Sequence, residues 1–406
     1  MSQPANEPEI KRPLANVDVS PPGAVESPQT RIGSFKLPSE SLRSYTMLFA
    51  LAAIWFYFYW RTGGIFLSPR NFSNLFQQMA VTGVLACGML MVIVAGQIDL
   101  SVGSVVGLAG GVAAIMQGRG GLAGALGSAL VIGILIGAVQ GGLVAYANIP
   151  AFIVTLGGML AWRGAILGWS GGETKPITIP LFRSLGIDYV PPSVGIALAA
   201  LAIAAVVWMT LSGNRARRRH GLSVPGPGAT AARIVLPSLV IVVFIYLMNS
   251  QAGVPIPVIV LIAVALLCAF LTQNTTFGRY LYAIGGNPDA ARLSGINLRR
   301  YILSAYCVLG LLVGVASLLH TSRVGSASPD AGSYMELDAI AACVIGGTSL
   351  MGGRGTIFGA CLGALIMASL DNGMSLLRVE NYTQYIVKGV VLVAAVGFDM
   401  LGRRRG

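Results

Sequence analysis

Long apolar runs separated by short polar stretches dominate the chain after residue 44. Runs of about 20 residues fit helices that cross a bilayer core of about 30 Å, because a helix satisfies its own backbone hydrogen bonds in lipid. The pattern predicts an all-α polytopic integral membrane protein with about 10–12 transmembrane helices. The predicted spans cover residues 45–60, 76–95, 102–116, 122–147, 152–169, 193–211, 234–248, 255–271, 302–320, 337–345, 357–370 and 385–398.

The polar segments define the domain organisation. Residues 1–44 are rich in proline and mixed charge, which predicts a disordered tail ahead of a transmembrane domain at 45–402. More than half of the 27 lysines and arginines fall in this tail, in 214–233, in 276–300 and at the C-terminal end. Cytoplasmic loops carry such an excess. We therefore expect both termini to be cytoplasmic.

The composition excludes several classes of protein. With 55% hydrophobic and 10% charged residues and a mean hydropathy of +0.74, the chain is not a soluble protein. Its net charge of +12 follows from the membrane orientation signal, so we expect no nucleic-acid partner. The five cysteines lie in apolar spans without a CxxC pair and predict small packing residues, not metal ligands. No P-loop or catalytic arrangement is present, so we expect neither an enzyme nor a cofactor.

The segment 276–300 carries strong helix signals outside the membrane. Gly285-Gly286 predicts a chain break, Asn287 is a good N-cap, and Pro288 suits the first helical position. The pattern predicts a short helix of about two turns, which is either a well-punctuated loop or a docking element for a cytoplasmic partner. The residues assigned to docking are Asn287, Asp289, Arg292, Ser294 and Gly295.

Two similar stretches indicate an internal repeat. Residues 98–103 and 336–341 each open a glycine-rich span, and the predicted topology brings them in from opposite sides. Five spans before and five after an inserted hairpin at about 193–251 would form inverted repeats, with interrupted helices lining a pathway. A chance likeness of glycine-rich helices is the alternative.

Ionisable residues at membrane depth are costly and face protein or water. Asp99 and Asp338 stand at helix starts, where a carboxylate can cap backbone N–H groups. Asp371 and Lys388 either pair with each other or cap broken helices. The residues predicted to line or support the pathway are Gln97, Asp99, Ser101, Ser104, Glu336, Asp338 and Thr348.

Three motifs carry a family resemblance. QIDLSVG at 97–103, AIGGNPDAARLSGI at 283–296 and AACVIGGTSL at 341–350 resemble the membrane permeases of bacterial sugar-importing ATP-binding-cassette (ABC) systems, the relatives of ribose permeases. The likeness covers nearly the whole chain after the tail. The family's first motif begins with Glu where this chain has Gln97, which leaves the need for a charge there open. The inserted hairpin and IMASLDNGMS at 366–375 resemble the xylose permeases of this family.

The resemblance implies a multi-pass permease of the bacterial inner membrane that translocates a monosaccharide, D-xylose. Its implied partners are a cytoplasmic ABC ATPase, a periplasmic sugar-binding protein, a second permease copy in a homodimer, and membrane lipid. The segment 276–300 becomes the ATPase-coupling element. The competing hypothesis from the residues alone is a secondary sugar transporter coupled to H⁺ or Na⁺, since inverted repeats and buried carboxylates suit both classes.

Overall fold

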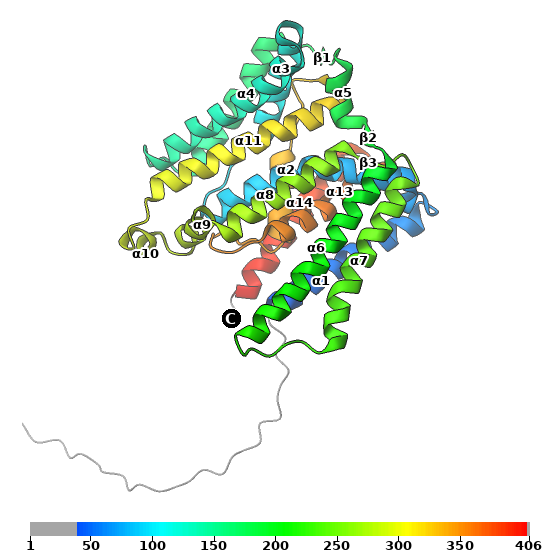
Figure 1. Cartoon of the computed structure of the whole chain (residues 1–406). Helices are drawn as coiled ribbons and strands as arrows, with labels where there is room; N and C mark the ends of the chain where they lie inside the picture. Colours follow the sequence, from blue (N-terminus) through cyan, green and yellow to red (C-terminus); the bar gives the residue numbers. More distant parts are fainter. Residues whose placement is uncertain (1–38, 404–406) are drawn as a thin grey trace, which may run out of the picture. The chain divides into compact units, whose positions relative to one another are not determined.

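The computed structural model describes residues 39–403, so most of the predicted tail lies outside the described residues. The fold is all-α, as predicted, with one 3-10 turn at Ile65–Leu67 (Figure 1). The helices are α1 Ser39–Arg61, α2 Pro69–Val94, α3 Val102–Ala145, α4 Ala151–Ser170, α5 Pro180–Ile187, α6 Pro192–Arg219, α7 Pro227–Asn249, α8 Ile256–Asn274, α9 Thr276–Gly286, α10 Pro288–Leu293, α11 Leu298–Val324, α12 Met335–Ile345, α13 Ile357–Leu376 and α14 Asn381–Arg403.

Two short antiparallel ladders connect the loops. Strand β1 (Lys175–Pro176) pairs with β4 (Ser326–Ala327), and β2 (Tyr189–Val190) pairs with β3 (Val254–Pro255). Helix α5 lies in the predicted polar loop between the fifth and sixth spans and packs against α11. The ladders and α5 therefore tie long connections to the ends of the helices.

Every predicted span falls on a helix, and eight helices within residues 39–403 are long and apolar enough to cross a membrane. Helix α3 has 44 residues and bends at Gly121, so it contains both the third and fourth predicted spans. Helix α12 has only 11 residues. At 1.5 Å per residue it extends about 16 Å, roughly half of the hydrocarbon core. The short tenth run at 337–345 therefore forms a helix that cannot cross this core by itself.

Glycines allow the closest helix packing. Helix α11 lies along α3 (Figure 1), and their backbones meet where Gly133 and Gly137 of α3 face Gly310 and Tyr306 of α11. A methyl group on Gly133 would collide with the carbonyl of Gly310, and one on Gly137 with the carbonyl of Tyr306. Small residues serve this purpose in membrane proteins, where apolar side chains gain little by leaving lipid. We call this contact the α3–α11 seam.

Helix α2 is the most buried span and packs against α8, α11, α12 and α13. In the predicted repeat, α2 corresponds to α11 and the second half of α3 to α13. The pairs α2–α13 and α3–α11 would then be equivalent, which is compatible with the observed packing. The inverted repeat itself stays a prediction.

The predicted inserted hairpin is formed by α6 and α7. The two helices pack against each other, and most of the surface of both is exposed. Their apolar exposed side chains suit contact with lipid, since a bilayer solvates such a surface.

Candidate functional site

The α9 end of the predicted coupling segment contacts two other parts of the chain through backbone atoms. Gly285 packs so closely on the end of α2 that a methyl group there would collide with the carbonyl of Val94. The N–H of Gly353, in the glycine-rich turn after α12, donates to the same Val94 carbonyl at 2.9 Å. Gly96 and Gly352 complete the contact. We call these five residues the glycine junction.

The junction corrects one prediction. Gly285 and Gly286 are the last residues of α9 and do not break the chain. The break falls at Asn287, whose backbone is extended. Glycine stands at position 285 because the backbones of α9 and α2 approach closely there, which only a residue without a side chain allows.

Helix α10 has the predicted capping residues. The Asn287 Oδ1 accepts from the N–H of Ala290 at 3.0 Å, and the Ser294 Oγ donates to the carbonyl of Ala290 at 2.9 Å. Gly295 adopts φ +81° just after the helix, and the following N–H, of Ile296, donates to the carbonyl of Ala291 at 3.1 Å. These bonds satisfy both ends of a helix of only six residues.

The outer surface of α10 combines charge with an exposed apolar group. Asp289 and Arg292 are exposed, and Ala291 is the buried residue that anchors the helix. Leu293 is 90% exposed. The sequence prediction omitted Leu293, although an apolar residue at the end of a polar, capped helix was a usable signal. An isolated exposed leucine is common on proteins, but this one sits among the predicted docking residues.

The first predicted pathway stretch, 97–104, covers most of the α2–α3 linker (residues 95–101) and the first residues of α3. The Asp99 Oδ1 accepts from the N–H of Ser101 at 2.8 Å and from its Oγ at 2.7 Å. Asp99 therefore supports the residue before α3, as a local Asx-type turn. Its side chain and that of Ser101 are buried, and so is Ser104 in the first turn of α3. Gln97 is half-buried, and its N–H donates to the carbonyl of Val92.

Sequence reasoning missed two partners of this linker. The Gln140 Nε2, from the second half of α3, donates to the Ser101 Oγ at 2.8 Å. Thr155 of α4 lies beside the linker, with its Oγ 3.4 Å from the carbonyl of Ile98. Both are buried polar residues in otherwise apolar helices, which is the signal that could have found them.

The second predicted stretch meets the first at Gly103. A methyl group on Gly103 would collide with the Oε2 of Glu336 at the start of α12. Arg163 of α4 holds the loop before α12, since its guanidinium donates to the carbonyls of Pro329 at 2.6 Å and Ala331 at 2.9 Å. The structure therefore brings the starts of α3 and α12 together.

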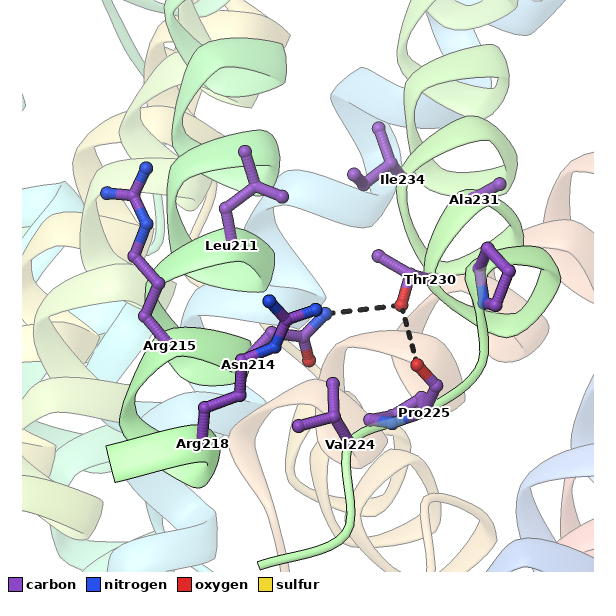
Figure 2. Close-up of a pocket in the computed structure, with 10 residues that line it drawn as sticks. Leu211, Asn214, Arg215, Arg218, Val224, Pro225, Thr230, Ala231 and Ile234 are labelled. Atoms are coloured by element: carbon purple, nitrogen blue, oxygen red, sulfur yellow. Dashed lines mark hydrogen bonds between the residues drawn. The ribbon is translucent and has the colours of Figure 1, made fainter. Parts of the chain in front are cut away.

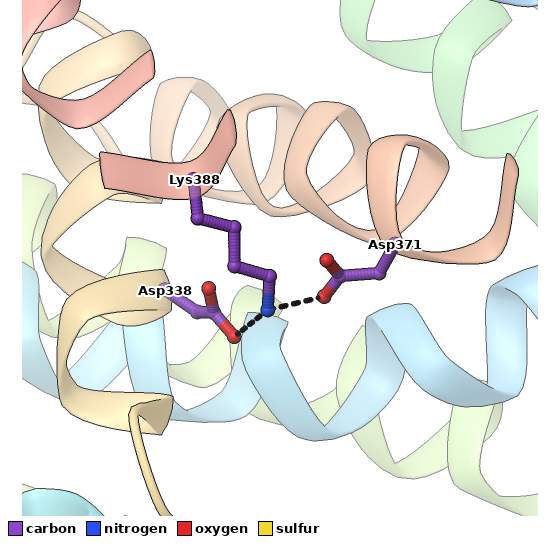
Figure 3. Close-up of polar contacts among 3 residues, drawn as sticks. All are labelled: Asp338, Asp371 and Lys388. Atoms are coloured by element: carbon purple, nitrogen blue, oxygen red, sulfur yellow. Dashed lines mark hydrogen bonds and ion pairs between the residues drawn. The ribbon is translucent and has the colours of Figure 1, made fainter. Parts of the chain in front are cut away.

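Asp338 does not cap α12. Its Oδ2 lies 3.0 Å from the Nζ of Lys388, which also lies 2.8 Å from the Oδ2 of Asp371 (Figure 3). Of the two alternatives given for Asp371 and Lys388, the structure shows the pair. A cavity of about 180 Å³ borders Asp338 and Lys388 and is also lined by Tyr334 and Tyr385. The capping prediction failed because a cation on α14, distant in sequence, binds the carboxylate more strongly than a backbone N–H does.

Thr348 lies apart from the Ser101–Gln140 contacts. It is fully buried in the turn after α12, and its Oγ1 has no hydrogen-bond partner among the described residues. Tyr282 of α9 donates to the carbonyl of Gly355 in the same turn at 2.7 Å. The turn thus contacts the coupling segment through a side chain as well as through the glycine junction.

Comparison with known proteins identifies the family. A family described as the permease component of branched-chain amino acid transport systems matches residues 71–396. The chain belongs to this family of transport permeases. It is 46% identical to the xylose transport system permease protein XylH of Escherichia coli K12 over 95% of this chain and 99% of that one. It is 44% identical to XylH of Haemophilus influenzae, over 91% and 100%, and 37% identical to the ribose import permease RbsC of Escherichia coli K12, over 82% and 87%.

No solved structure matches the chain significantly. The family and the eight apolar helices establish a multi-pass inner-membrane protein, a permease of the sugar ABC importer type. Its relatives are transport permeases, so the polar groups described above are candidates for a transport pathway.

Proposed function

We propose that this permease translocates D-xylose across the inner membrane, powered by a separate ABC ATPase. The observation that carries the proposal is the identity of 46% to a xylose permease over almost the full length of both chains. Identity to the ribose permease is lower, at 37%. The broader family description names amino acids, but the XylH and RbsC relatives compared above are sugar permeases.

The chemistry of the α2–α3 linker supports a neutral, hydroxyl-rich substrate. Ser101, Gln140 and Thr155 offer hydroxyl and amide groups around an interrupted helix start. Such groups both donate and accept hydrogen bonds, which a sugar hydroxyl requires. An amino acid would need partners for a separate ammonium and carboxylate. We assign Gln97, Ser101, Ser104 and Thr348 to the pathway, with Asp99, Glu336 and Asp338 as supporting residues.

The predicted coupling segment, residues 276–300, supports the hypothesis that a separate ATPase supplies the energy for transport. We propose that α10 docks the ATPase through Asp289, Arg292 and Leu293, on the cytoplasmic side together with both termini. The glycine junction then gives docking a mechanical route, because movement of α9 acts on the Val94 carbonyl and on the turn at 346–355. Val94 immediately precedes the α2–α3 linker. A periplasmic sugar-binding protein and a second permease copy complete the proposed importer.

Co-purification followed by a turnover assay tests this function. The permease is isolated with its bound proteins, and ATP hydrolysis is measured with xylose, ribose or leucine and the respective binding protein. We expect xylose to give the largest stimulation. Stimulation by leucine alone would contradict the assigned substrate.

A second arm separates the two energy sources. Xylose uptake is measured in vesicles that contain ATP, with and without an uncoupler that collapses the ion gradient. ATP-driven uptake should survive the uncoupler. Collapse of uptake with ATP still present would contradict ABC-driven import and favour the ion-coupled secondary transporter.

A further inference from the structure

A cavity lies between α6 and α7 at the end of the inserted hairpin. Its volume is about 490 Å³, and it is closed on one side by the connection between the helices, at Val224 and Pro225. The Asn214 amide donates to the Thr230 Oγ1 at 3.2 Å across it, which fixes the separation of the two helices (Figure 2). The cavity is remote in sequence from every residue assigned above to the pathway or to docking.

The lining of this cavity carries positive charge. Arg215 and Arg218 border it. Figure 2 shows the Arg218 side chain extending into the space between the helices, whereas the Arg215 side chain extends along the other side of α6. Among the described residues, neither arginine has a carboxylate within ion-pair distance. A guanidinium without an anionic partner is well suited to bind phosphate, which it contacts through a planar set of donors.

The rest of the lining is apolar and continues into the lipid-facing surface. Leu211 and Ile234 form opposite walls of the cavity. Trp208 on α6 and Leu236 on α7 lie close to these walls in sequence and are exposed. A ligand held here would therefore have its anionic group against the Arg218 guanidinium and an apolar portion along the two helices. A free anion would use only half of these contacts.

We infer that the cavity between α6 and α7 binds the phosphate of an anionic phospholipid, with the acyl chains lying along the exposed apolar faces of the hairpin. Basic pockets between membrane helices, at the level of the headgroups, recognise such lipids. The inserted hairpin, whose helices pack mainly on each other, is thereby anchored in its leaflet by a bound lipid. This role is independent of the transported substrate and of the ATPase.

Native mass spectrometry of the purified full-length permease in neutral detergent tests the inference. The protein is titrated with phosphatidylglycerol or with phosphatidylcholine, and the fraction carrying bound lipid gives the affinity. We expect phosphatidylglycerol to bind more tightly. The Arg218→Gln variant should lose about fivefold in that affinity, the effect expected for one arginine near the headgroups.

The matched control is the Arg219→Gln variant, which removes the same charge from the same helix end but from a residue outside the cavity lining. It should keep most of the affinity. An equal loss in both variants, or equal binding of the two lipids, would overturn the site. Inorganic phosphate at the same concentration should not displace the lipid, because it lacks the apolar contacts. Displacement would assign the cavity to free phosphate and overturn the lipid inference.

Discussion

Lys388 of α14 lies 2.8 Å from Asp371 of α13, and the same ammonium reaches Asp338 of α12. One cation thus joins three helices inside the membrane domain, and two carboxylates depend on it. The Oδ1 atoms of both aspartates have no hydrogen-bond partner among the described residues. The lysine is therefore the main compensation for two carboxylates that are largely withdrawn from water.

Replacing this lysine should destabilise the permease. In Lys388→Met the two carboxylates face each other without a counter-charge. We expect the free energy of unfolding to fall by about 2 kcal/mol, between the values for exposed and fully buried pairs, because the Asp371 side chain is 31% exposed. Thermal unfolding in detergent measures the loss. Adding Asp338→Asn and Asp371→Asn should restore most of it, and unchanged stability of Lys388→Met would contradict the assigned role.

Altering the surface of α10 should release the ATPase and leave the permease folded. The Asp289→Arg/Arg292→Asp variant reverses both exposed charges, and Leu293→Ser removes the exposed apolar group. We expect each variant to reach the membrane at a normal level and to co-purify with less ATPase. A pull-down measures this as the amount of captured ATPase relative to the amount of permease. The control is Asn287→Ala, which removes a cap worth about 1 kcal/mol and leaves the exposed side chains of α10 unchanged. It shows how much ATPase is lost when α10 is only destabilised. Undiminished capture by the charge-reversed variant would disprove docking through these residues.

The orientation can be tested with two positions. Arg218→Cys should be cytoplasmic, and Thr178→Cys should lie outside, because the positive residues cluster near residue 218. Each cysteine is introduced into a cysteine-free background and treated with an impermeant thiol reagent on intact cells. Labelling is expected at 178 alone. Labelling at 218 alone would reverse the topology.

Substitutions in the α2–α3 linker and the first turn of α3 should distinguish residues that support the fold from residues that line the sugar path. Asp99→Asn keeps the oxygen that accepts from Ser101, so sugar uptake should stay close to normal. Asp99→Leu leaves a buried N–H and a hydroxyl without this acceptor, at a cost of about 1–3 kcal/mol, and should impair folding. Ser104→Trp should block uptake while the ATPase remains bound. Uptake is compared at matched permease levels. Normal uptake by Ser104→Trp, or complete inactivity of a well-assembled Asp99→Asn protein, would show that the roles are wrong.

The helices and the capped segment could be predicted from the sequence because their signals are local. Apolar runs locate the spans, and Asn287, Pro288 and Gly295 locate α10 within a residue. The short tenth run at 337–345 falls within α12, because the glycine-rich turn after Ile345 marks its end in the sequence.

Apart from the Asp371–Lys388 pair, the contacts among polar groups could not be predicted, because they join residues far apart in the chain. Gln140 lies 39 residues from Ser101, and Lys388 lies 50 residues from Asp338. Nothing in the local pattern says which face of a glycine-rich helix meets which neighbour. For the same reason the local pattern predicts a chain break at Gly285 and does not show its contact with the Val94 carbonyl at the end of α2.

The α3–α11 seam has a consequence for how this protein tolerates mutation. Gly133, Gly137 and Gly310 carry no chemistry, yet any side chain there would collide with backbone that cannot rotate away. A complete survey of single substitutions would then find a row of positions at four-residue spacing that accept glycine alone. Gly127 and Gly142, on the same helix but facing open space, would accept many residues. Sensitivity to mutation would thus follow the distance between two backbones, and the most constrained positions would not mark the sugar path.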